Sequence, residues 1–344
     1  RGALKLRFAE ASFPVLAANI IDDATGLPVA WDNVRPSVMV DVQGVKVGIV
    51  GVLSSNGLIT TIAANTVGLS LAPLAETIRK EATVLRDDGA DVVIVTAHAG
   101  GRCNEFSDPR DLSSCNLGGE IMRVAQALPE GLVDHIIAGH VHQGIAHVVN
   151  GIAITSSFSS TRAISRVDFT VDRATGSIKN RQVFPPQPVC LRVTYPGGAC
   201  AAPTDLPSSV RDAVYEGVPV VPDAVVVAIA DHAAAIAEKI RNEPLGAVLE
   251  APFDAPSATE SPLGNLMTDA VRESLGADVA VHNVRGGIRS GLPAGPLTFG
   301  DVYKMFPFDN RVVILDLSGR ELRDVVAGQI MNGRRLAGFS GLHI

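Results

Sequence analysis

The chain has 344 residues, of which 47% are hydrophobic and 19% are charged, and its formal net charge is −7. This length predicts about two domains with large cores. No basic block is present, which disfavours duplex nucleic acid as a partner. The chain has no run of 18 or more apolar residues, so no transmembrane segment is predicted. The chain starts at Arg1 and stops abruptly, so we expect a fragment cut at both ends, with any signal peptide outside it.

The first half of the chain alternates strand-like and helix-like segments. Apolar runs predict buried strands at residues 13–21, 46–53, 92–95 and 134–142, and helical spacing predicts helices at 74–90 and 117–129. Two β-hairpins follow, with turns at 150–151 and 174–176. Residues 1–185 therefore read as an α/β domain that becomes mostly β at its end.

The second half begins with a change of composition. Residues 186–222 have little periodicity and much Pro and Gly, which predicts a connecting segment. A helix is expected from 223 to 242, and a second α/β unit follows it, with a helix at 265–277 and a strand at 278–284. Residues 223–344 are thus expected to form a linker helix and a second domain.

The four cysteines fall into two local pairs on polar, loop-like segments, Cys103 with Cys115 and Cys190 with Cys200. Two disulfides, each stabilising by roughly 3 kcal/mol in the chain-entropy model, are favoured over four reduced thiols. Disulfides indicate an exported protein. A metal site built from the cysteines would need a short C-x-x-C spacing, which the chain lacks.

Three histidines follow two of the predicted strands. His140 and His142 come directly after the apolar stretch IIAG, and His98 follows the strand at 92–95. In an extended segment, residues two apart point to the same side, and open α/β sheets place their sites at the carboxyl ends of strands. The pattern predicts half of a metal site, and the alternative is a set of ordinary core and surface histidines.

The other histidines lack such a setting. His135 and His147 are expected to be structural or superficial, and His232 is expected to face solvent on the helix after Pro222.

Several motifs resemble one known family. DVVIVTAHAG followed by IIAGHVHQG is similar to the last two histidine motifs of the calcineurin-like metallophosphoesterases. FPVLAANI and KVGIVGVL resemble segments of their 5′-nucleotidase branch, and ESPLGNLMTDAV, GGIRSG and FPFDNRVV resemble its C-terminal domain. The resemblance implies an αββα sandwich, truncated at its N-terminus, followed by an incomplete C-terminal α/β domain that binds substrate.

The resemblance also implies two divalent metal ions, drawn from Zn, Mn, Fe, Co and Mg. His98 and His140 would bind one ion and His142 the other. The remaining ligands of the family are an Asp-x-His, a bridging Asp and the Asn of Gly-Asn-His-Glu, whose His is the general acid. All of them lie upstream of this chain. We therefore expect the 344-residue chain alone to bind metal weakly and to lack phosphatase activity.

In the second domain, the resemblance assigns substrate binding to two side chains. Arg289 would bind phosphate, with Gly286 and Gly287 allowing close backbone approach, and Phe308 would stack on a nucleobase. Without the resemblance, GGIRSG reads as an ordinary turn and Phe308 as a core residue.

Three departures from the family pattern put the exact substrate in doubt. Ser257 stands where an Arg is usual, Val284 where an Asn is usual, and Arg285 where a Gly is usual.

The resemblance implies metal-dependent hydrolysis of nucleotide phosphate esters, with substrate held between two domains. Export would place the protein in the periplasm, in the medium or at the cell surface. The alternatives are a 2′,3′-cyclic-nucleotide phosphodiesterase, a nucleotide-sugar pyrophosphatase, a thiosulfate-ester hydrolase and a non-catalytic binding module that retains the fold. The oligomeric state stays open.

Overall fold

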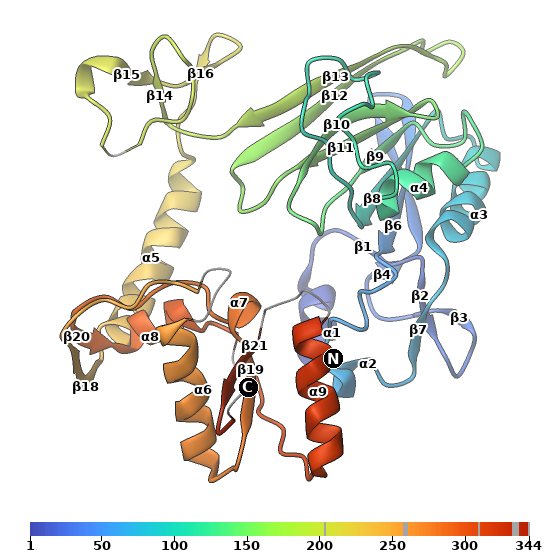
Figure 1. Ribbon diagram of the computed structural model, residues 1–344. Helices are drawn as coiled ribbons and strands as arrows, with labels where there is room; N and C mark the ends of the chain where they lie inside the picture. The colour runs from blue at the N-terminus through green and yellow to red at the C-terminus, as the bar shows by residue number, and fades with distance from the viewer. Residues whose placement is uncertain (203, 257–260, 309, 332–336, 343–344) are drawn as a thin grey trace. The chain divides into compact units, whose positions relative to one another are not determined.

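The computed structural model describes residues 1–202, 204–256, 261–308, 310–331 and 337–342. The chain divides into two compact units, Arg1–Val221 and Pro222–Ile344 (Figure 1).

The first unit contains most of the sheet structure. Its helices are α1 (Gly2–Glu10), α2 (Ala63–Thr66), α3 (Leu74–Asp87), α4 (Glu120–Ala127) and the 3₁₀ turn η1 (Pro207–Ser209). Its longer strands are β5 (Ser37–Val42), β6 (Val45–Leu53), β8 (Val92–His98), β9 (His135–Ile137), β10 (Gly144–Val149), β11 (Ile152–Ser157), β12 (Ala163–Val171) and β13 (Ile178–Pro188). Its short strands are β1 (Val15–Leu16), β2 (Ile20–Asp22), β3 (Leu27–Pro28), β4 (Val34–Arg35), β7 (Leu69–Leu71), β14 (Arg192–Thr194), β15 (Val210–Asp212), β16 (Val214–Tyr215) and β17 (Val218–Pro219).

A six-stranded sheet forms the centre of this unit, in the order β10-β11-β9-β8-β6-β5. The four inner strands run parallel, and β5 and β10 pair antiparallel at the two edges. Leu53 of β6 pairs with His98 of β8, and Thr96 of β8 pairs with Ile137 of β9. The carboxyl ends of these three strands therefore meet at one edge of the sheet.

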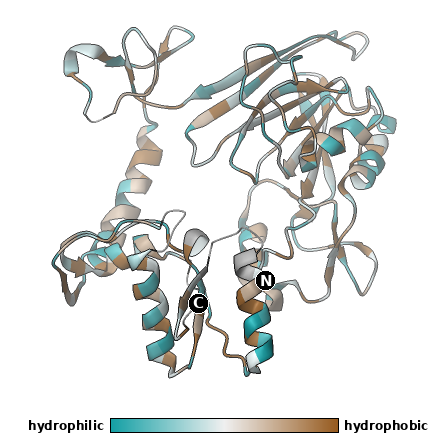
Figure 2. Cartoon of the chain, viewed as in Figure 1, coloured by the Kyte–Doolittle hydropathy of each residue, from teal (hydrophilic) through white to brown (hydrophobic). Residues whose placement is uncertain are grey.

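Helices α3 and α4 supply the apolar cover that a parallel sheet requires. The buried positions of α3 repeat at helical spacing through Leu74, Ile78, Ala82 and Leu85. In Figure 2 the central strands are mainly brown, whereas α3 and α4 carry both brown and teal residues. The core of the unit is the layer between these helices and the sheet.

The expected strand at 13–21 is wrong. This segment forms β1 and β2, which belong to two different small sheets. Between them the side chain of the buried Asn19 accepts a hydrogen bond from the Leu53 N–H at 2.8 Å and donates one to the Leu53 carbonyl at 2.7 Å. A Cβ on Gly51 would lie 2.3 Å from Cβ of Leu16, so glycine is needed where β1 crosses β6.

Both expected hairpins are confirmed. β10 and β11 join at Asn150 and Gly151, whose φ values of 49° and 73° match the left-handed turn that such sequences favour. β12 pairs with β13 around the turn at 172–177.

Residues 186–222 carry two small antiparallel pairs, β14 with β15 and β16 with β17. Both expected disulfides, Cys103–Cys115 and Cys190–Cys200, are formed.

The second unit begins with the long helix α5 and carries a smaller core. Its helices are α5 (Ala224–Arg241), α6 (Pro262–Leu275), α7 (Val284–Gly287), α8 (Phe299–Met305) and α9 (Gly319–Met331), and its strands are β18 (Pro244–Leu249), β19 (Ala280–Asn283), β20 (Gly295–Thr298) and β21 (Ala337–Ser340). Helix α6 starts three residues before the predicted helix, because Ser261 caps it by accepting the Gly264 N–H at 3.2 Å. No helix in the described ranges is both long and apolar enough to cross a bilayer.

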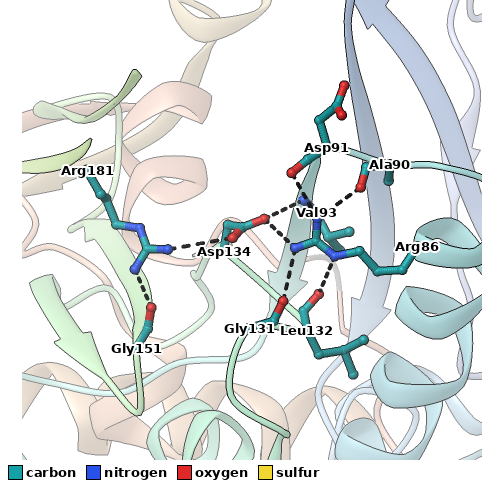
Figure 3. A network of polar contacts seen from close by, with 9 residues as sticks. All are labelled: Arg86, Ala90, Asp91, Val93, Gly131, Leu132, Asp134, Gly151 and Arg181. Carbon is teal, nitrogen blue, oxygen red and sulfur yellow. Dashed lines mark hydrogen bonds and ion pairs between the residues drawn. The ribbon is translucent and has the colours of Figure 1, made fainter. Parts of the chain in front are cut away.

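A buried carboxylate ties the amino ends of β8 and β9 together (Figure 3). Asp134 is 6% exposed, and its Oδ2 accepts hydrogen bonds from Arg86 at 2.7 Å and from the Val93 N–H at 2.8 Å. Its Oδ1 lies 3.6 Å from the Arg181 guanidinium of β13. Arg86 also donates to the carbonyls of Ala90, Asp91, Gly131 and Leu132. Helix α3, two sheet strands and the β12–β13 hairpin thus share one charged centre.

Replacing Asp134 with Asn should lower the free energy of unfolding by about 3 kcal/mol, because two partly buried guanidinium groups lose their counter-charge. Denaturant unfolding of the wild-type and variant proteins measures this difference. The control is Glu10→Gln, which breaks the exposed pair with Arg7 on α1 and should change stability by less than about 1 kcal/mol. Equal effects of the two substitutions would contradict the assignment of Asp134 as an anchor.

Candidate metal centre

His98 and His140 meet at the carboxyl edge of the central sheet. His98 is the last residue of β8, and His140 lies in the loop that follows β9. The Nδ1 atom of His140 is 3.2 Å from Nε2 of His98, and the two ring centroids are 4.7 Å apart. Two imidazoles from separate strands are thus brought to one point.

The loop that carries His140 and His142 is not extended, so the alternation argument made from the sequence is wrong here. Strand β9 ends at Ile137, and both histidines have positive φ, 75° and 58°. Residues other than glycine rarely adopt this region, and backbone strain of this kind is concentrated at functional sites. A Cβ on Gly100 would lie 2.4 Å from the Gly139 carbonyl oxygen, so glycine is needed for the loops after β8 and β9 to approach each other.

The spacing of the two imidazoles fits shared metal ligation. Two nitrogens, each about 2.1 Å from one ion, lie roughly 3.0 to 3.4 Å apart between octahedral and tetrahedral geometry, and the observed separation is 3.2 Å. Burial, followed by the nearby His140 and His142, lowers the pKa of His98, which keeps its imidazole neutral and able to ligate. His142 is exposed, and within the described residues it does not complete a compact three-ligand cluster with the other two.

A carboxylate that sequence reasoning missed lies beside His140. Glu120, in the first turn of α4, accepts hydrogen bonds from the Ser54 hydroxyl at 2.6 Å, the Ser55 N–H at 2.9 Å and the Ser55 hydroxyl at 2.5 Å. Burial raises the pKa of Glu120, but these hydrogen bonds and the nearby His140 outweigh it, so the net pKa is lowered. An ionised carboxylate therefore joins α4 to the end of β6, within electrostatic reach of His140.

A second group of ligand-type residues is not available to a metal. Cys103, Cys115 and His147 have ligand atoms within 4.8 Å of one another. The two sulfurs form a disulfide and cannot act as thiolates. His147 is fully buried in β10, which agrees with the structural role expected for it.

His135 is also a structural histidine. It is 7% exposed at the start of β9, and its Nε2 lies 2.9 Å from the Thr155 hydroxyl. Burial, together with the nearby Arg181, lowers the pKa of His135 to about 4. His232 is exposed on α5, as expected.

In the second unit, Arg289 lies over Phe308. The Arg289 guanidinium carbon is 5.7 Å from the centre of the Phe308 ring. Phe308 is 46% exposed, whereas Phe306 packs against the core of this unit. These two side chains present one cationic and one aromatic group on the same surface.

Local packing explains the glycines at positions 286 and 287, close to Arg289 in the chain. A Cβ on Gly286 would lie 2.7 Å from the Asn283 side chain, and one on Gly287 would lie 2.7 Å from His282. The Gly286 N–H donates to the Asn283 side chain, which caps the short α7.

Of the departures noted in the sequence, Val284 is buried in the core of the unit at the first position of α7. Ser257 lies outside the described residues, and the side chain of Arg285 is likewise not described.

Residues 242–344 match the family model of the 5′-nucleotidase C-terminal domain. The 5′-nucleotidase of Vibrio cholerae is 23% identical over 96% of this chain and 60% of its own length. The 5′-nucleotidase precursor of Thermus thermophilus has the same fold, with a TM-score of 0.65 and 22% identity over 99% of this chain and 62% of that one. Residues 242–344 thus resemble the C-terminal domain of 5′-nucleotidases in sequence, and nearly the whole chain shares their fold. The α/β fold expected from the sequence is confirmed.

Two further relatives carry other names. Endonuclease YhcR of Bacillus subtilis is 27% identical over 93% of the chain and 23% of its own length. Cell wall protein Lmo0130 of Listeria monocytogenes is 26% identical over 93% of the chain and 40% of its own length. The chain spans less than two thirds of the length of each of these curated relatives.

The stability of the protein should fall as the pH drops from about 6.5 to 4, in part because of His135. Its folded pKa of about 4 lies below the unfolded value of 6.5, so the unfolded chain binds more protons in this window. The stabilisation is complete above pH 6.5 and declines by roughly 2 to 4 kcal/mol as the pH approaches 4. Unfolding free energies measured across this range for wild type and His135→Gln test this, since the variant should lose less stability on acidification. Parallel pH profiles would show that His135 does not titrate as described.

Proposed function

We propose that this chain carries part of the active site of a metal-dependent hydrolase that cleaves phosphate esters of nucleotides. The observation that carries the proposal is the 3.2 Å approach of His98 and His140 at the carboxyl edge of the sheet. Similarity to 5′-nucleotidases supports the substrate class. The proposal includes two divalent ions, with His98 and His140 at one ion and His142 at the other.

Each residue of the site has a defined task in this proposal. A divalent ion, when bound, lowers the pKa of a water and polarises the phosphoryl oxygens. His98 at the end of β8 and His140 in the loop after β9 present imidazole nitrogens 3.2 Å apart, and His140 does so from a backbone of positive φ. Glu120 adds negative charge beside His140, and its hydrogen bonds to Ser54 and Ser55 hold the end of β6 against α4.

The second unit is proposed to bind the rest of the nucleotide. Arg289 offers a forked donor that matches a phosphate, and the exposed Phe308 ring offers a stacking surface for a base. The substrate would contact both units, and the missing carboxylate ligands would come from upstream residues of a longer protein. The 344-residue chain alone would then bind metal weakly and turn over no nucleotide.

The two disulfides support a protein exported to the periplasm, the medium or the cell surface. The similarity to a relative named as an endonuclease makes phosphodiester substrates the second candidate class. A panel of nucleoside monophosphates, cyclic nucleotides, nucleotide sugars and single-stranded oligonucleotides separates these classes, and the proposal expects the monophosphates to be cleaved fastest.

Replacing His140 with Ala in the longer protein should weaken binding of the metal that it shares with His98 by at least about 10- to 100-fold, since a direct ligand is lost. Inductively coupled plasma mass spectrometry after dialysis against a metal buffer measures the metal content. The matched control is His232→Ala on the exposed face of α5, which should retain the wild-type content. Unchanged metal content in the His140 variant would contradict the assignment of His140 as a metal ligand.

Replacing Phe308 with Ala in the longer protein should raise KM for nucleotides about 10-fold, because one base–aromatic stacking contact is worth roughly 1 to 3 kcal/mol. KM for p-nitrophenyl phosphate should stay within about twofold, since that substrate has no base to stack. Steady-state kinetics with both substrates provides the measurement, and Phe299→Ala serves as an exposed aromatic control from the same unit. Equal changes in the two KM values would count against a base-binding role.

A further inference from the structure

A polar cavity of about 450 Å³ opens beside His140 in the first unit. Its wall combines the end of β6, the loop after β8, the start of α4 and the loop after β9 (Figure 1). The polar side chains that line it, besides His140 and the serines at the end of β6, come from Asn56, Arg102, Asn116, Glu120, Arg123 and Gln143. The cavity therefore shares His140 with the candidate metal centre, and its other lining residues are not among the proposed metal ligands.

Glycine backbone closes one side of this cavity. A Cβ on Gly119 would lie 3.2 Å from the Cα of Gly101, and one on Gly101 would lie 3.2 Å from the Met122 side chain. Gly100 makes the even closer approach to Gly139 noted above. The segments around the cavity thus approach one another closely at these three glycines.

The charged side chain of the cavity that has no partner in the described residues is positive. Glu120 is the one acidic side chain among its lining residues and already accepts three hydrogen bonds from Ser54 and Ser55. Arg123 donates to the Gly118 carbonyl. Arg102 is exposed, and the described residues offer its guanidinium no hydrogen-bond or ion-pair partner. Arg102 therefore has all five of its donors available to a ligand.

The neutral side chains around Arg102 add donors of the same kind. The Asn116 side-chain oxygen accepts the Gly118 N–H at 3.1 Å, which leaves the amide nitrogen of Asn116 to donate. Gln143 is exposed and is also a lining residue of the cavity. A ligand that matches this set must be anionic and must present several acceptor oxygens, which describes a phosphate group.

We propose that this cavity binds a second phosphate group, adjacent to the one that is hydrolysed, and that Arg102 is its principal contact. The substrate class would then be nucleoside 5′-diphosphates and triphosphates, with the terminal phosphate at the metal centre and the next phosphate in the cavity. This deepens the proposed function and rests on it for the identity of the substrate. The anion site itself rests only on the cavity, its charge and its donors.

The test uses inorganic pyrophosphate as the probe and isothermal titration calorimetry of the 344-residue chain in metal-free buffer. Wild type should bind pyrophosphate, and Arg102→Ala should weaken binding at least about 10-fold, with Arg102→Lys intermediate because it keeps the charge but loses the fork. The matched control is Arg110→Ala, an exposed arginine in the Cys103–Cys115 loop that directly follows Arg102; Arg110 does not line the cavity, and the variant should bind as wild type does. Circular dichroism confirms that each variant is folded.

A second measurement separates the cavity from the proposed function. In the longer protein, Arg102→Ala should lower the ratio of kcat/KM for adenosine diphosphate to that for adenosine monophosphate by about 10-fold. Arg102-dependent pyrophosphate binding without any nucleotide turnover would uphold the anion site and refute the nucleotidase. No pyrophosphate binding by wild type, equal binding by the Arg102 and Arg110 variants, or an unchanged substrate ratio would overturn the proposal.

Discussion

The site depends on the in-register parallel pairing of β6, β8 and β9. Because Leu53 pairs with His98 and Thr96 pairs with Ile137, the residues that follow these strands emerge at one edge. A one-residue slip of β9 would turn its side chains to the opposite face of the sheet. The contact between His98 and His140 is therefore a direct consequence of strand register.

The two ends of β8 and β9 hold polar groups in different settings. At the amino ends, Asp134 is buried and saturated by Arg86, Arg181 and the backbone of β8, as Figure 3 shows. At the carboxyl ends, His98 and His142 are exposed. At the amino ends, the hydrogen bonds and ion pairs of Asp134 fix the register of the strands. At the carboxyl ends, exposure leaves the imidazoles available to ligands.

Strands β6 and β8, both hairpins and both disulfides could be predicted from the sequence, because they depend on local apolar runs, turn residues and short cysteine spacings. Strand β5 was not predicted. The strand expected at 13–21 could not, because Asn19 bonds to Leu53, 34 residues away, and local patterns do not report such a contact.

The candidate site could be predicted only in part. The positions of His98 and His140 after apolar strands single them out, and the structure brings their rings together, while metal binding stays a prediction. The reason given for His140 and His142 is wrong, since both adopt positive φ in a loop. Glu120 was missed because its partners are Ser54 and Ser55, about 65 residues earlier. Its position as a carboxylate at a helix start, just after Gly118 and Gly119, was the available signal. The donors around Arg102 were missed for the same reason, because their convergence is a product of the tertiary fold.

The most direct test of this account is anomalous X-ray scattering from crystals of the longer protein grown with Mn²⁺ or Zn²⁺. The account predicts a peak within about 2.3 Å of both Nε2 of His98 and Nδ1 of His140. The absence of a peak between these two nitrogens, with metal bound elsewhere in the protein, would contradict it.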